Sequence, residues 1–144
     1  MDRLGGARGR RLTEREDADA QGRREGTQLS LFDVDDPANP RLLHKVKLGL
    51  ETSSEAEYDH HAFLWWEPLR LAVVPVTDFD GDTPAQAIGF RVDRTAGIAE
   101  AGRTSEAADV LRTLVVGGRL FTLTSEGLHA YDLNTLAPGP LTRF

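Results

Sequence analysis

The chain has 144 residues, of which 40% are hydrophobic, and a formal net charge of −6 at pH 7. This length suffices for one domain with a core, and the acidic balance argues against a nucleic-acid partner, since nucleic-acid binding depends on clustered Lys and Arg. The sequence has no cysteine, which excludes disulfides and thiolate metal sites, and no apolar run of the about 20 residues that span a membrane.

Residues 1–26 are rich in arginine and poor in apolar side chains. They include seven Arg and six acidic residues, with Leu4 and Leu12 as the only large aliphatic residues apart from Met1. Such a segment buries too little apolar surface to offset its ordering entropy, which predicts a mostly disordered tail before a domain over 27–144. No apolar stretch follows the basic residues, so the segment is not a secretory signal, and the chain as written is expected in the cytoplasm.

Alternating strand patterns begin after this tail. Residues 28–34 alternate in polarity, the Asp/Pro/Asn cluster at 35–40 predicts a turn, and 41–48 continue as a second strand. Residues 49–57 form a polar linker.

A second hairpin lies at the centre of the sequence. The short aromatic block at 62–66 suits a strand, and Glu67-Pro68 predicts a turn because proline disfavours the helical region for the residue before it. Residues 71–76 are almost continuously apolar, as in a strand covered on both faces. Because proline lacks an N–H, we expect the ladder to be interrupted at Pro75.

The rest of the chain continues in short strands. A Gly-Gly pair, which supplies the positive φ of a tight turn, marks one further hairpin, and the ambiguous stretch 104–109 is assigned to a loop. The strands expected here are 86–93, 98–103, 111–116, 119–124 and 128–133.

Three of the strands resemble one another. Phe32, Phe90 and Tyr131 are each followed two residues later by an aliphatic residue and then by an Asp or Asn that opens a turn. Units of about 40 to 50 residues with four short strands are typical of β-propeller blades. The sequence therefore predicts an all-β, incomplete β-propeller of about two and a half four-stranded antiparallel blades, which is too few to close a ring alone.

Three sequence motifs support this architecture. The strings QLSLFDVDDPANP from Gln28, SEAEYDHHAFL from Ser54 and LVVGGRLFTLT from Leu114 resemble a bacterial and archaeal family of secreted proteins with a carboxy-terminal β-propeller domain, distantly related to WD-repeat proteins. The resemblance covers roughly residues 17 to 137. It implies an extracytoplasmic setting and a chain that is a truncated, carboxy-terminal portion of a longer propeller.

Asp59, His60 and His61 form the first cluster with metal-ligand chemistry. Neighbouring residues of a strand point to opposite faces, so the two histidines could share an ion only on irregular backbone. One histidine with Asp59 is feasible, but hydrogen bonding of the histidines to backbone between blades is the favoured interpretation.

Asp78, Asp80 and Asp82 form the second cluster. Closely spaced carboxylates suit a hard cation such as Ca²⁺. An EF-hand would need a Glu eleven positions after Asp78, where the sequence has Gly89, so a plain acidic turn is favoured and no cofactor is assigned.

We expect a noncatalytic binding or scaffold module of unknown partner rather than an enzyme, because the sequence has no nucleophile elbow, phosphate loop or zinc-protease motif. The alternative is a fragment of a metal-dependent hydrolase or lyase that uses Asp59, His60 and His61. A third hypothesis is self-association, because the open edges of incomplete blades invite pairing.

Overall fold

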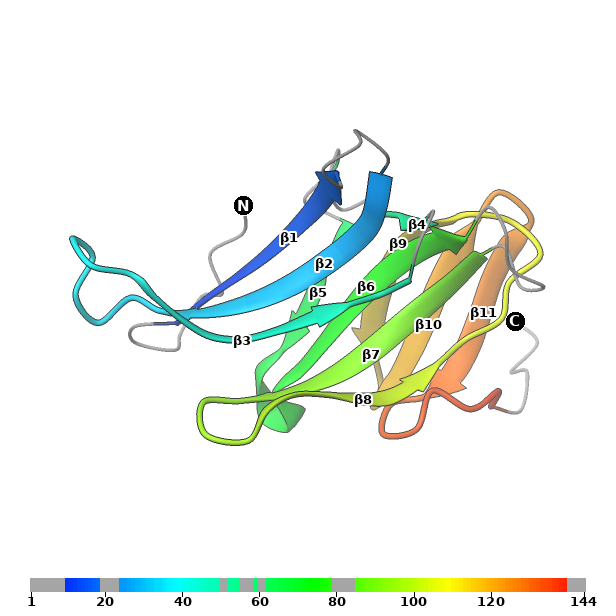
Figure 1. The fold of residues 1–144 in the computed structure, drawn as a ribbon. Helices are drawn as coiled ribbons and strands as arrows, with labels where there is room; N and C mark the ends of the chain where they lie inside the picture. The colour runs from blue at the N-terminus through cyan, green and yellow to red at the C-terminus, as the bar shows by residue number, and fades with distance from the viewer. Residues whose placement is uncertain are drawn as a thin grey trace.

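The computed structural model describes residues 10–18, 24–49, 52–54, 59, 62–78 and 85–139. In these residues the strands form three antiparallel sheets, which we call blades A, B and C in chain order. Figure 1 shows the three blades side by side, with blade B in the middle.

Blade A has the strand order β1-β2-β3. Its strands are β1 (Arg10–Ala18), β2 (Arg24–Asp33) and β3 (Arg41–Lys47). The expectation of a mostly disordered tail is wrong for β1 and for the start of β2. The prediction from composition failed because backbone hydrogen bonds to a neighbouring strand can hold an added strand, and these bonds form whether or not its side chains are apolar.

Blade B is built around two long central strands. Its strands are β4 (Thr52–Ser53), β5 (Leu64–Trp66), β6 (Leu71–Asp78), β7 (Ala85–Asp93) and β8 (Gly97–Arg103). The short 3-10 helix η3 (Glu67–Leu69) makes the turn predicted at Glu67-Pro68, and Arg70 closes it with a φ of 47°.

The ladder on one side of β6 is interrupted where Pro75 was predicted to interrupt it. Strand β5 pairs with β6 over Leu71–Val73, and β4 pairs with it over 77–78, which leaves Pro75 between the two ladders. The Pro75 carbonyl accepts a hydrogen bond from the hydroxyl of Ser54 instead. Strands β4 and β5 therefore share one of the four strand positions of this blade.

Blade C consists of β9 (Val110–Val116), β10 (Arg119–Thr124) and β11 (Gly127–Asp132). The predicted Gly-Gly turn joins the first two, with φ of 57° at Gly117 and 74° at Gly118. A single bridge between Tyr131 and Pro138 marks the fourth strand position. With three, four and three strands in place, the blades make up the two and a half four-stranded units that the repeat predicted.

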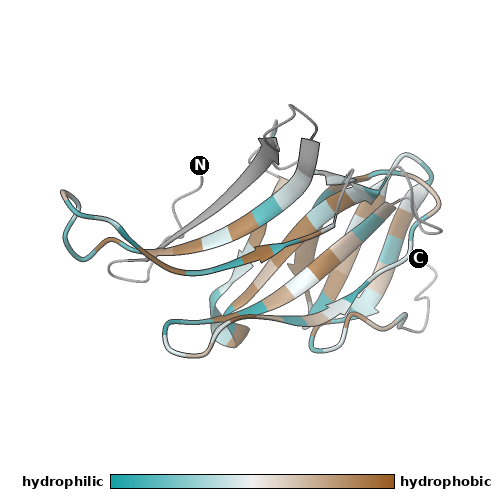
Figure 2. Ribbon diagram, viewed as in Figure 1, coloured by the Kyte–Doolittle hydropathy of each residue, from teal (hydrophilic) through white to brown (hydrophobic). Residues whose placement is uncertain are grey.

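One apolar layer lies between blades A and B, and another between blades B and C. Ala72, Val74 and Val76 of β6 belong to the first layer, whereas Leu71 and Val73 belong to the second. Figure 2 shows hydrophobic positions along the strands of all three sheets. The expectation that this strand is covered on both faces is confirmed, and the fold is an all-β, incomplete β-propeller.

Among the described residues, no helix has the length and apolar character to span a membrane.

Candidate functional site

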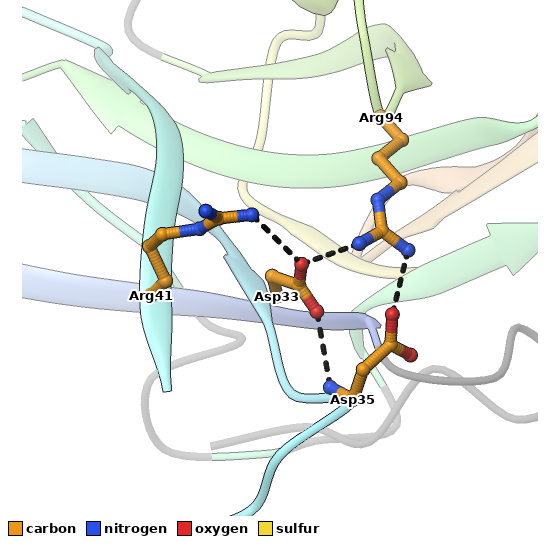
Figure 3. Close-up of polar contacts among 4 residues, drawn as sticks. All are labelled: Asp33, Asp35, Arg41 and Arg94. Carbon is orange, nitrogen blue, oxygen red and sulfur yellow. Dashed lines mark hydrogen bonds and ion pairs between the residues drawn. The ribbon is translucent and has the colours of Figure 1, made fainter. Parts of the chain in front are cut away.

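Asp33, at the end of β2, ties blade A to blade B (Figure 3). Its carboxylate Oδ1 accepts the backbone N–H of Asp35 at 3.0 Å. Its Oδ2 accepts hydrogen bonds from Arg41 of β3, at 3.3 Å, and from Arg94, in the turn between β7 and β8. Arg94 also donates to Asp35 at 2.9 Å. One arginine of blade B therefore binds two carboxylates of blade A.

The electrostatics of this cluster favour its charged form. The backbone hydrogen bond from Asp35 and the positive charges of Arg94 and Arg41 hold the pKa of Asp33 below its ordinary value, although partial burial opposes them. The same contacts raise the pKa of Arg94, chiefly through its hydrogen bond to Asp35. The four groups are an ion-pair network that fixes two blades, and they leave no acid–base pair poised for proton transfer.

Two other blade turns use an acid in the same way. Asp93 ends β7, where its Oδ1 accepts two backbone N–H groups of the following turn at 2.8 Å and its Oδ2 binds Arg70 at 2.7 Å. Asp132 ends β11, and its Oδ1 accepts two backbone N–H groups at 2.8 and 2.9 Å. These bonds lower the pKa of Asp132. Only at Asp93 is the recurring acid of the sequence repeat itself the turn cap. In the other two turns the cap, Asp33 or Asp132, lies two residues before the repeat position, Asp35 or Asn134.

Blade B contacts the turn that follows β11 of blade C through Arg91 and Gly102. Arg91 of β7 donates to the carbonyl of Leu69 at 2.8 Å and to the side chain of Asn134 at 3.3 Å. A Cβ at Gly102 of β8 would lie 2.0 Å from the carbonyl oxygen of Thr135, so only glycine permits this approach.

Glu106 is the buried acid of the blade B–blade C boundary. Its side chain is 1% exposed and lies in the segment that links the two blades. The backbone N–H of Glu106 donates to the Ala85 carbonyl of β7 at 2.9 Å. Its carboxylate accepts bonds from the hydroxyls of Thr122 and Tyr131 and from Nδ1 of His129, each at 2.6 Å. One side chain therefore joins β10 and β11 to the linking segment.

A shallow depression of about 480 Å³ lies beside this cluster, lined in part by Glu106, Glu126, His129 and Tyr131. Burial and the neighbouring Glu106 carboxylate raise the pKa of the Tyr131 phenol above its ordinary value of 10.0. Tyr131 therefore keeps its proton at neutral pH, as a donor to Glu106 must. Because three donors already bind the Glu106 carboxylate, it is suited to holding the blades together.

Sequence reasoning did not identify Glu106, because the stretch 104–109 has no clear periodicity. Of the partners of Glu106, only Tyr131 is marked by the sequence, as a member of the repeat. The alternation of β10 and β11 places the hydroxyl groups of Thr122 and Tyr131 on the buried face of blade C. Buried hydroxyl groups need hydrogen-bond partners, so this pattern could have indicated a buried polar residue nearby.

The predicted metal residues are only partly described. Asp59 lies at the boundary of blades B and C, where its carboxylate is 3.9 Å from the guanidinium of Arg112. Asp78 is the last residue of β6. Among the described residues, no three His, Cys, Asp or Glu side chains are placed to share a metal ion.

The remaining candidates, His60, His61, Asp80 and Asp82, lie outside the described residues. Both metal hypotheses, including that of Ca²⁺, stay predictions.

Among the described residues, one face of blade C packs against blade B and the other face packs against no blade. The inward residues of β10, Leu120 and Thr122, are fully buried, whereas Leu123 on the opposite face is 37% exposed. We call this opposite side the open face of blade C. Its apolar residues belong to neither apolar layer and are Leu114, Val116, Phe121, Leu123 and Leu128. The strand register places three charged residues on the same face, namely Arg112, Arg119 and Asp132.

Comparison with known proteins agrees with the blade architecture. The family described as "Beta propeller domain" matches residues 9–136. The match begins within the segment that was expected to be a tail, as β1 does.

An uncharacterized protein of Methanocaldococcus jannaschii is 30% identical over 107 residues, which cover 74% of this chain and 16% of the relative. The chain thus spans about one sixth of that relative's length. No solved structure matches the chain.

Proposed function

Since the chain belongs to the beta propeller domain family and is a module of the binding or scaffold kind, we propose that it works without catalysis, by packing the open face of blade C against another β-sheet. The observation that carries this proposal is the unequal covering of the blades. Both faces of blade B are covered by neighbouring blades, while one face of blade C presents apolar side chains to solvent.

The polar clusters support a structural role for the charged residues. The Asp33–Arg94 network joins blades A and B, and the Glu106 cluster joins blades B and C. In each cluster the carboxylate is occupied by donors from its own protein. Such groups position blades, and the open face then provides the surface for binding.

We further propose an extracytoplasmic setting, as part of a longer propeller protein. The support is the resemblance of the sequence to secreted propeller proteins, together with the small share of the Methanocaldococcus jannaschii relative that the chain covers. Cell fractionation with an antibody against this chain should find the antigen outside the cytoplasm. Recovery in the cytoplasmic fraction alone would contradict this part of the proposal.

The binding role is tested by the mass of residues 1–144 in solution, measured by light scattering with circular dichroism as the check of folding. We expect a discrete assembly larger than one chain, and we expect Leu123→Lys to convert it to a folded monomer because a buried lysine would be unpaired. A folded monomer at every concentration, with no effect of Leu123→Lys, would contradict the proposed role.

A further inference from the structure

The hydroxyl of Thr113 on β9 is buried and has no hydrogen-bond partner among the described residues. The residue as a whole is 7% exposed. A buried polar group without a partner is costly, and nearly all such groups in folded proteins are bonded to protein atoms or to ordered water. The Thr113 hydroxyl therefore calls for a partner other than a neighbouring side chain.

The strand register places Thr113 in a polar row across the inward face of blade C. Thr113 of β9 is opposite Thr122 of β10, and Thr122 is in turn opposite His129 of β11. Directly opposed residues lie on one face of a sheet. Thr122 and His129 both bind the carboxylate of Glu106, each at 2.6 Å. Thr113 is thus the third member of a row whose other two members share one buried acid.

The two threonine hydroxyls of this row have complementary hydrogen-bonding capacity to spare. The Thr122 hydroxyl donates its hydrogen to Glu106, and its oxygen can still accept. The Thr113 hydroxyl can both donate and accept. The Cβ atoms of directly opposed residues are about 5 Å apart, so one water molecule can bridge their hydroxyls. A buried water needs two to four polar partners, and these hydroxyls supply two.

We propose that an ordered water molecule is bound between β9 and β10 at the blade B–blade C boundary, with hydrogen bonds to Thr113 and Thr122. Through Thr122 this water extends the Glu106 network from β10 and β11 to β9, the third strand of blade C. A metal ion fits the position less well, because three donors already bind the Glu106 carboxylate. The site lies on the inward face and is independent of the partner of the open face.

Thr113→Val tests the site by stability, because valine has nearly the shape of threonine without its hydroxyl. With the water in place, the substitution should raise the unfolding equilibrium constant about fivefold, the effect of one lost hydrogen bond. Without it, valine would remove an unpaired buried hydroxyl, and the constant would fall. Urea unfolding measures the change. Thr95→Val, at an exposed turn position, is the control and should change the constant by less than about twofold.

A crystal structure tests the site directly. At a resolution that shows ordered waters, a water should lie within hydrogen-bond distance of Oγ1 of both Thr113 and Thr122. It should be missing from crystals of Thr113→Val and present in those of Thr113→Ser, which keeps the hydroxyl. A wild-type crystal without this water would overturn the proposal, as would a Thr113→Val protein at least as stable as the wild type.

Discussion

At the scale of single residues, the account depends on Glu106. Its carboxylate accepts three hydrogen bonds from blade C while its backbone N–H pairs with blade B. A buried acceptor with three donors is costly to alter, because each donor loses its partner away from water.

Glu106→Gln should therefore lower the free energy of unfolding by about 3 kcal/mol, because the NH₂ group of the glutamine can only donate hydrogen bonds and would face groups that also donate. Urea unfolding followed by circular dichroism measures the change. Glu126→Gln, an exposed acid beside the same depression, is the control and should change it by less than about 0.5 kcal/mol. Equal effects of the two substitutions would show that Glu106 does not join the blades.

Tyr131 gives this cluster a signature at alkaline pH. Its pKa is raised in the folded protein, so above pH about 10 the unfolded chain loses the phenolic proton before the folded chain does. The contribution of Tyr131 to the free energy of unfolding should therefore be constant below pH about 10 and fall above it. Tyr131→Phe should make the fall less steep, and Tyr58, the other tyrosine, is common to both proteins. Identical slopes for the two proteins would contradict the buried phenol.

Arg94 and Arg41 bind the same carboxylate of Asp33 from different blades. Arg94→Ala should lower the unfolding midpoint more than Arg41→Ala, because only Arg94 joins blade A to blade B and binds two acids. The difference should shrink in high salt, which screens exposed ion pairs. A larger effect of Arg41→Ala in thermal melts at low salt would refute the role assigned to Arg94.

At the scale of the elements, the close approach of blade C to β8 depends on Gly102. Gly102→Ala would place a Cβ 2.0 Å from the carbonyl oxygen of Thr135, and the required shift should cost about 2 kcal/mol of unfolding free energy. Gly139→Ala, whose Cβ would lie 3.6 Å from its nearest neighbour, is the control and should be almost neutral. The same urea unfolding measures both, and a neutral Gly102→Ala would argue against this contact.

The strands with a clear pattern were predictable. Residues 71–76 are apolar without interruption because β6 is covered by both neighbouring blades. The turn between β9 and β10 was predictable because two adjacent glycines can adopt the positive φ angles that it has. Strand β1 was not predictable from composition, because its register to β2 is a property of backbone pairing. The Glu106 cluster depends on contacts between segments 16 to 25 residues apart, which no local pattern specifies.

At the scale of the whole molecule, the central claim is that blade B is covered on both faces by its neighbours and that blade C is open on one. Hydrogen–deuterium exchange of the full chain, read peptide by peptide, tests this directly because protection follows local stability. We predict the slowest exchange in β6 and β7. In Leu123→Lys, where the open face has no partner, exchange should rise in β9 to β11 and stay slow in β6 and β7. Uniformly fast exchange through β6 and β7 would contradict the stacked-blade account.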